Sequence, residues 1–296
     1  MQRYSYQLVN VFAESHFGGN PLAVFPQADG LSQQQMQLIA RQFNLSETVF
    51  IQAVDKSAAN KQSAVRKLKI FTPNYEMPFA GHPTIGAAFV LHNLLQLEDT
   101  YRLQTEAGQV RIQHQHEVIT LALNNGVEVE NAPLTAEQAA AILGLQPTDI
   151  ASRPVWGDTG TDQLLIQLAS AQAVAACRIN TALFLQQALS KSGKAQLYVW
   201  FEQNGKTKVR LFFGQNGVVL EDPGTGSAAA NLGGWAIANQ RTPLDWNITQ
   251  GDEIRRPNRL RLQVDQQQII YVGGKVILVG QGEFFLPLST NQNQTL

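Results

Sequence analysis

The 296-residue chain has little cysteine, little charge and no long apolar segment, and each scarcity excludes a class of protein. Its one cysteine, Cys177, cannot form an internal disulfide or a multi-thiolate metal site. Its five histidines lack HExxH-type spacing, so we expect no metal. No run approaches the roughly 18 apolar residues that span a bilayer, and residues 1–10 alternate like a strand rather than a secretory signal. We therefore expect a soluble, cytoplasmic protein without membrane association.

Charged residues make up only 15% of the chain, the formal net charge is −1, and neither end carries a charged tail. This composition disfavours a nucleic-acid partner. The length suggests two domains of roughly 150 residues, and 44% hydrophobic residues can fill their cores. We predict an N-terminal lobe over residues 1–125 and a C-terminal lobe over residues 126–280. Late strands at 268–272, 276–279 and 284–288 could complete either half, with 281–296 a candidate to return to the first lobe.

The two halves begin helices in the same way. Ser32 and Gln35 form a capping box before an apolar helical face. Thr135 and Gln138 repeat the pattern, and that helix should stop at Gly144. Capping boxes are common, so this echo alone does not prove that the halves are related.

A second correspondence strengthens the echo, because each half has a glycine-bearing turn that leads directly into an apolar helix. Setting Gly81 against Gly226 also aligns His82 with Ser227. Neither helix has a charged residue in its first three turns, which is typical of a buried helix. We therefore predict an α+β protein of two pseudo-symmetric halves, each a β-barrel-like sheet wrapped around a central buried helix.

These two turns are also the first candidates for a functional site. A helix N-terminus carries unpaired N–H groups and about half a positive charge, so it receives carboxylates and oxyanions. If the halves pack face to face, both termini converge on one interdomain cleft, a usual place for a small-molecule site. The alternative is that each is an ordinary turn-and-cap sequence, which is favoured for either turn alone and less so for the pair.

Glu47 is the most informative titratable residue. A strand over residues 46–51 would put Glu47 on the same side as Val49 and Ile51. A carboxyl group on an apolar face loses hydration, which raises its pKa toward the range of a general acid/base. The alternative is a carboxylate that is exposed or bonded to local backbone.

The other titratable or polar groups beside the turns each have a structural alternative as well. His82 could donate to a substrate or only cap its helix. Asp222 could orient an amine or hydroxyl, or serve as a turn residue. Ser227 could bind a carboxylate or only begin the helix. Glu76 and Glu221 look like supporting residues.

Taken together and in order, the motifs resemble the PhzF-like phenazine-biosynthesis family. They span nearly the whole chain: Gly-Asn-Pro at 19–21, Ser-Glu-Thr-Val-Phe at 46–50, Phe-Thr-Pro at 71–73, the segments 76–84 and 221–228, and Val-Gly-Gly at 272–274. The resemblance implies a diaminopimelate epimerase-like fold with the site between two lobes. It also implies a homodimer, although no exposed apolar stripe in the sequence indicates one.

By motif, the resemblance implies that Glu47 is the general acid/base and that His82 and Asp222 act with it. It assigns substrate binding to a second set of residues: Asn20, Gly81, Gly226 and Ser227. Related racemases use two cysteines, but Cys177 lies in neither glycine turn, so that mechanism is excluded here. The segment Arg255–Asn258 departs from the Gly-Arg-Pro-Ser that many relatives carry, which leaves substrate detail near it open.

We therefore expect a cofactor-independent isomerase that acts on a small carboxylate-bearing metabolite. Glu47 would remove a proton from carbon and return it elsewhere, in a 1,3- or 1,5-hydrogen shift, while the helix N-termini and His82 stabilise the anion. One alternative is a binding protein of the same fold without turnover. Another is a non-cysteine amino-acid epimerase with Glu47 and Asp222 on opposite faces. Fold and family do not identify the substrate or pathway.

Overall fold

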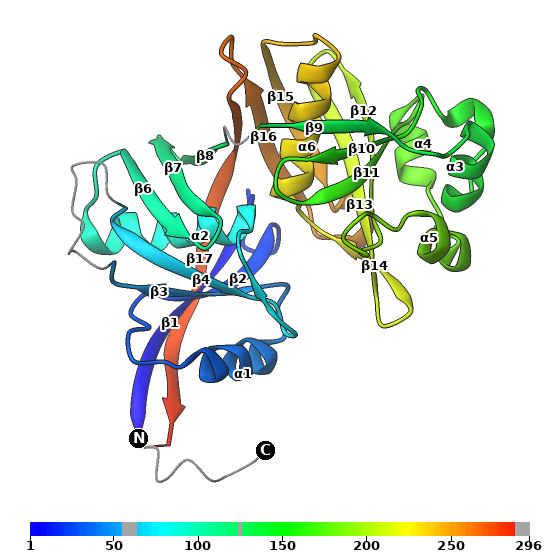
Figure 1. Cartoon of the computed structure of the whole chain (residues 1–296). Helices are drawn as coiled ribbons and strands as arrows, with labels where there is room; N and C mark the ends of the chain where they lie inside the picture. Colours follow the sequence, from blue (N-terminus) through cyan, green and yellow to red (C-terminus); the bar gives the residue numbers. More distant parts are fainter. Residues whose placement is uncertain (55–63, 124–125, 288–296) are drawn as a thin grey trace.

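The computed structural model describes residues 1–54, 64–123 and 126–287, which form two lobes side by side (Figure 1). The first lobe runs from blue to cyan and the second from green to yellow, and the orange-red strand β17 (Ile270–Leu286) extends from the second along the first. All strands belong to one network of ladders. No helix within the described ranges is long and apolar enough to cross a membrane.

The first lobe is a ring of eight strands that closes on itself. Each strand pairs with the next in the order β1 (Gln2–Val11), β2 (Asn20–Phe25), β3 (Thr48–Gln52), β4 (Arg66–Phe71), β6 (Thr100–Thr105), β7 (Gly108–Gln115), β8 (Val118–Leu123) and β17, which returns to β1. The short strand β5 (Glu76–Met77) pairs with β4. Helix α2 (Gly81–Leu95) contacts strands around the ring, while α1 (Gln33–Phe43) packs on β3 and β4 from outside.

The second lobe has the same number of strands in one run but no ladder that joins its two ends within the described residues. The run is β9 (Glu128–Asn131), β10 (Val155–Asp158), β11 (Asp162–Gln167), β12 (Gln196–Gln203), β13 (Lys206–Gln215), β15 (Leu244–Gln250), β16 (Asn258–Val264) and β17. Strand β14 (Val218–Asp222) pairs with β13, and helix α6 (Gly226–Ala238) packs on the sheet. A second hydrophobic cluster lies under α3 (Ala136–Leu143), α4 (Ala171–Ala176) and α5 (Thr181–Gln187). The sequence thus predicts the mixed class and the buried helices, but among the described residues a complete barrel forms only in the first lobe.

The order of pairing repeats between the lobes. Strands β2 and β3 are parallel, as are β11 and β12, and in both lobes an antiparallel strand and a short hairpin strand follow before the buried helix. Phe71 pairs with Glu76 in the first lobe, and Phe212 pairs with Glu221 in the second. Each buried helix begins five residues after that glutamate, so positions can be matched between lobes residue by residue.

The helix boundaries follow the sequence signals. Both predicted capping boxes form, Ser32 with Gln35 and Thr135 with Gln138, and Gly144 ends α3 in the left-handed conformation. Helices α2 and α6 differ, because neither has a side-chain hydrogen bond from its N-cap residue. Their first N–H groups are therefore not satisfied by a capping side chain.

Two strand predictions require correction. Strand β3 begins at Thr48, so Glu47 precedes the strand instead of lying on one of its faces. Residues 48–51 are buried on both faces, because α1 covers the side that faces away from the ring. The late strands are one strand, Ile270–Leu286, which pairs in turn with β16, β8 and β1. The predicted chain after residue 287 and the Asn124–Asn125 part of the lobe boundary lie outside the described residues.

Gly273 lies where β17 crosses β8, and we expect Gly273→Ala to destabilise the protein by about 1–3 kcal/mol, the usual range for overpacking. A Cβ there would lie 2.7 Å from the carbonyl oxygen of Ile119 and 3.1 Å from Cα of Thr120. Backbone atoms cannot move away as a side chain can. Urea unfolding measures the change. Gly280→Ala on the same strand is the control, since its Cβ would meet nothing closer than 3.8 Å; equal losses in both variants would contradict this account.

Candidate active site

The two buried helices meet at their N-termini. A Cβ built on Gly81 would lie 3.5 Å from Cα of Gly226, and one built on Gly226 would lie 3.6 Å from Cα of Gly81. A Cβ at either position would thus be in ordinary van der Waals contact with the other helix start, so the two backbones lie close together. The termini therefore converge, as the pairing of the glycine turns predicts. Two sets of N–H groups without capping side chains lie together at the junction of the lobes.

Glu47 and His82 face each other beside this junction. Glu47 Oε2 lies 3.4 Å from His82 Nε2, and the side chains are only 16% and 7% exposed. Neither atom has a hydrogen-bond partner among the described residues. Burial and, as the smaller cause, the negative charge of Asp222 together raise the pKa of Glu47 to about 8. Burial lowers the pKa of His82 to about 3. Near neutral pH the pair is therefore a largely protonated carboxyl group beside a neutral imidazole.

Asp222, at the end of β14, is the second buried carboxyl group. Its Oδ1 accepts a hydrogen bond of 3.2 Å from Asn20 Nδ2, and its Oδ2 accepts one from the Thr225 hydroxyl. Burial raises the pKa of Asp222 to about 6, although these hydrogen bonds act to lower it. Gln250 fixes the turn, because its Nε2 donates to the Asp222 carbonyl oxygen at 2.9 Å and its Oε1 accepts from the Thr225 N–H at 3.1 Å.

Asn20 joins the two lobes. Its Nδ2 also donates to the Gly224 carbonyl oxygen at 3.0 Å, so the amide nitrogen binds the Asp222 turn on two sides. Asn20 is fully buried, and its Oδ1 has no partner among the described residues. The position of this predicted substrate-binding residue is therefore that of a support for Asp222, with only its oxygen free.

The segment Arg255–Asn258 holds the Gly19–Asn20 turn. Arg256 donates from Nε to the Gly19 carbonyl oxygen at 2.7 Å and from an Nη to Asn10 Oδ1 at 2.9 Å, and the Gly19 N–H donates to the Pro257 carbonyl oxygen at 2.8 Å. Arg255 has a left-handed φ of 58°, a conformation that favours glycine. A glycine, which the resemblance leads us to expect at this position, would adopt this conformation without strain.

Glu76, Glu221 and Cys177 lie in structural surroundings. Glu76 lies 2.9 Å from Lys69 Nζ, and Glu221 accepts two hydrogen bonds from Arg210, at 3.0 and 2.7 Å, so both support their hairpins as expected. Cys177 is 1% exposed, and burial raises the pKa of its thiol to about 12, so this buried thiol stays protonated near neutral pH.

Ser227 accepts a hydrogen bond from Gln163, a residue that the sequence alone does not single out. Gln163 lies on β11, and Asn231 of α6 binds its amide oxygen. Asn231 is a polar side chain inside an apolar helix, and this local signal could have led to Gln163 and Ser227 from the sequence. Tyr198 was also missed; its hydroxyl is fully buried without a described partner, and this burial, together with the charge of Asp222, raises its pKa.

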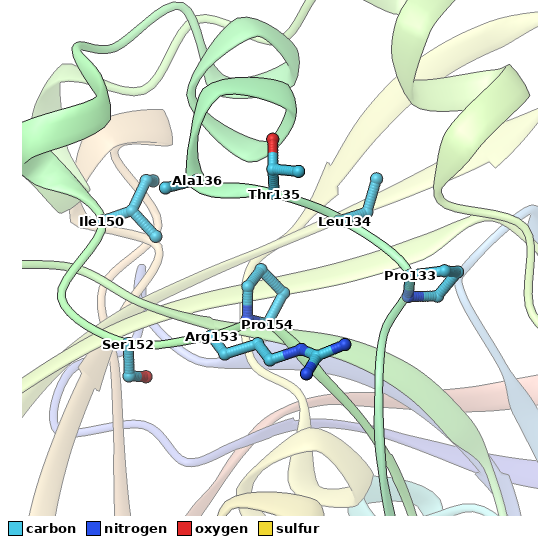
Figure 2. A pocket seen from close by; sticks show the side chains of 8 residues that line it. All are labelled: Pro133, Leu134, Thr135, Ala136, Ile150, Ser152, Arg153 and Pro154. Carbon is cyan, nitrogen blue, oxygen red and sulfur yellow. The ribbon is translucent and has the colours of Figure 1, made fainter.

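Two surface hollows lie elsewhere. One of about 600 Å³ is bounded by the start of α3 and by residues 150–154 (Figure 2). The other, of about 580 Å³, lies on the first lobe beside Arg3, Arg66 and the end of α2. Neither is lined by Glu47, His82 or Asp222. Within the described ranges, no three His, Cys, Asp or Glu side chains are grouped to hold a metal ion.

The fold and the paired helix starts define a class of two-lobed α/β proteins. The chain superposes on a Bacillus anthracis protein of the PhzF family with a TM-score of 0.82 at 22% identity, covering 97% of this chain and 100% of that one. On a hydroxyproline epimerase of Agrobacterium vitis the TM-score is 0.63 at 13% identity, with 95% and 92% covered. These likenesses concern the fold alone.

The sequence identifies the family within that class. Residues 9–282 match the PhzC-PhzF family model, described as phenazine biosynthesis-like protein, and the chain belongs to this family. It is 61% identical to an uncharacterized isomerase of Pasteurella multocida, over 96% of this chain and 95% of the relative. It is 29% identical to the trans-2,3-dihydro-3-hydroxyanthranilate isomerase of Pseudomonas chlororaphis, over 96% and 100%. The protein is an isomerase of the PhzF family.

Because burial raises the pKa of Glu47 to about 8 from its ordinary value of 4.5, its proton is bound by the folded state and not by the unfolded state between those values. The free energy of unfolding should therefore fall as pH rises through this window. The raised pKa of Asp222 makes the free energy of unfolding depend on pH only up to about pH 6. The lowered pKa of His82 makes it change in the opposite direction, and only below about pH 6.5.

Between pH 6.5 and 8, the free energy of unfolding of the wild type, measured with urea, should therefore fall by on the order of 2 kcal/mol, at about 1.4 kcal/mol per pH unit. In Glu47→Gln this fall should be absent. Glu14→Gln changes an exposed carboxyl group and is the matched control. An identical pH dependence in the wild type and Glu47→Gln would contradict the buried, proton-binding state of Glu47.

Proposed function

We propose that this protein is a cofactor-independent isomerase that moves a proton within a small carboxylate-bearing metabolite, between pseudo-symmetric lobes spanning residues 1–125 and 126–280. The single observation that carries the proposal is the buried Glu47 carboxyl group, 3.4 Å from His82, beside the two helix N-termini. Membership of an isomerase family supports the reaction type. The homodimer and the cytoplasmic location stay predictions.

In the proposed reaction, ionised Glu47 takes a proton from a carbon of the substrate and the C–H electron pair delocalises toward an acceptor group. The protonated Glu47 then returns the proton to a second carbon, so atoms and charge balance within one substrate molecule. N–H groups at the starts of α2 and α6, with the neutral His82, would stabilise the delocalised anion; one such preorganised donor is typically worth about 3 kcal/mol. Burial suits Glu47 to both roles, because a pKa of about 8 allows it to accept and donate near neutral pH.

The match between the lobes favours a hydrogen shift over a two-base epimerisation. Thr48 pairs with Phe71, and Leu197 pairs with Phe212 at the equivalent register, so Glu47 corresponds to Gln196 in the second lobe. An amide cannot remove a proton from carbon. The epimerase alternative would instead use Asp222, but both of its carboxylate oxygens already accept hydrogen bonds.

The relative of Pseudomonas chlororaphis supports a substrate class. Its name specifies trans-2,3-dihydro-3-hydroxyanthranilate, a cyclic molecule that carries an amino, a hydroxyl and a carboxylate group. In the proposed site the carboxylate would bind the helix N-termini and Ser227, and the amino or hydroxyl group would bind Asp222. We take this compound as the first substrate to test.

Glu47→Gln should lower kcat by about 10²–10⁴-fold or more, because it removes the carboxylate that the proposed reaction uses to accept the carbon-bound proton. Turnover of trans-2,3-dihydro-3-hydroxyanthranilate and incorporation of solvent deuterium into recovered material are the two measurements. Substrate binding, followed by calorimetry, should persist, since glutamine preserves the shape of the side chain.

Glu76→Gln is the control, because Glu76 is a glutamate of the same lobe that lies in an ion pair with Lys69; it should keep near-normal turnover. Binding without turnover or exchange in the wild type would favour the binding-protein alternative. A product that differs only in configuration at one carbon would favour the epimerase. Near-normal turnover by Glu47→Gln would remove Glu47 from the reaction.

The pH profile gives an independent test of the base. Since ionised Glu47 is the active form and its pKa is about 8, kcat/KM should rise about tenfold per pH unit below pH 8 and level off above it. Asp222→Asn removes the charge that helps to raise this pKa, so whatever activity remains should level off at lower pH. A profile that is flat from pH 6 to 9 would exclude a base with this pKa.

A further inference from the structure

Ser227 is held by a buried chain of amide side chains that the proposed reaction does not use directly. Gln163 Nε2 lies 3.1 Å from Ser227 Oγ and 3.1 Å from Gln196 Oε1, so both of its hydrogens are committed. Gln163 Oε1 accepts a 2.8 Å hydrogen bond from Asn231 Nδ2. Gln163 and Asn231 are 1% and 0% exposed.

The direction of every hydrogen bond in this chain follows from one backbone carbonyl group. Asn231 Nδ2 lies 2.7 Å from the Thr161 carbonyl oxygen, which can only accept, so the amide nitrogen and not the oxygen must face it. The same nitrogen must then donate to Gln163 Oε1, which turns Gln163 Nε2 toward Ser227. The Thr159 hydroxyl completes the chain by donating to Asn231 Oδ1 at 2.7 Å.

Packing does not require these amides, as the other lobe demonstrates. By the register of the parallel strands Gln163 corresponds to Leu22, and by distance from the helix start Asn231 corresponds to Gly86. In the first lobe the Leu22 side chain fills the space over Gly86, and Leu22 is fully buried. An apolar pair therefore fills the same position in the same architecture. Since leucine and glycine can fill this position, packing does not explain the buried amides, and their cost of desolvation points to a role in function.

We infer that Gln163 and Asn231 are positioning residues that make Ser227 a dedicated hydrogen-bond donor to the substrate. Because Gln163 donates to Ser227 Oγ, the Ser227 hydroxyl hydrogen is directed away from Gln163 and is left for another acceptor. Its acceptor is an anionic oxygen of the ligand, which the proposed function supplies as a carboxylate, and the inference rests on that function. The first lobe offers the Glu47 base, whereas the second has the amide of Gln196 in the corresponding position.

A double-mutant cycle tests the route through Ser227. Gln163→Met should raise KM for trans-2,3-dihydro-3-hydroxyanthranilate about tenfold with little change in kcat, in the range for losing a hydrogen bond to a charged group. Ser227→Ala should raise KM at least as much. In the Ser227→Ala background, Gln163→Met should add less than twofold, because the group it acts on is gone.

Gln167→Met on the same strand is the control and should leave KM unchanged. A tenfold effect of Gln163→Met in both backgrounds would mean that Gln163 acts through the fold and not through Ser227. An unchanged KM in Gln163→Met would also overturn the inference.

Neutron diffraction from wild-type crystals in heavy water decides the direction of the bonds without any turnover. The expected maps place two deuterons on Gln163 Nε2, one facing Ser227 Oγ and one facing Gln196 Oε1, with the Ser227 deuteron pointing elsewhere. A Ser227 deuteron directed at Gln163 would overturn the inference. If trans-2,3-dihydro-3-hydroxyanthranilate is not turned over, the proposed substrate fails, and the neutron maps still decide the role of Gln163.

Discussion

The site depends on the removal of the Glu47 carboxyl group from water. A carboxylate that is buried without an opposite charge loses the hydration that stabilises its charged form. Here the neighbours of Glu47 are a neutral imidazole and a second acid, Asp222. The proton is therefore held at a pH where free glutamate would have lost it. The same burial that costs folding stability brings the pKa close to that of a useful general acid/base. Stability and proposed activity are thus linked through one group.

The architecture keeps this carboxyl group buried by joining two lobes at several polar contacts. The glycine helix starts allow the backbones to touch, and Asn20 and Arg256 bind across the junction. Within each lobe the first turns of the central helix are almost entirely buried, so packing holds the helix N-terminus in place. Donor groups held in this way need no reorganisation when charge develops on a ligand, which is the property that preorganised catalytic sites share.

Local signals in the sequence predict the parts of the fold that local chemistry determines. The capping boxes at Ser32 and Thr135 form, and the apolar helices after Gly81 and Gly226 are buried as their composition indicates. The start of β3 and the single long strand β17 were missed, because both depend on partners far away in the chain. In the described part of the chain only the first lobe closes, because β17 pairs with both β8 and β1 there, and composition does not reveal such pairings.

The residues of the site also fall into those that local sequence motifs predict and those that they do not. Glu47, His82 and Asp222 lie in recognisable motifs, and the structure gathers the three around one junction. No local sequence signal marks Gln163 and Gln196. Their roles can be recognised only when the register of β11 and β12 is matched with that of β2 and β3.

The most direct test of this account is a carbon-13 NMR titration of the Glu47 carboxyl carbon, assigned by its loss in Glu47→Gln. The account predicts a midpoint near pH 8. A midpoint near the ordinary value of about 4.5 would contradict it, because a carboxyl group that ionises there is not held dry between the lobes.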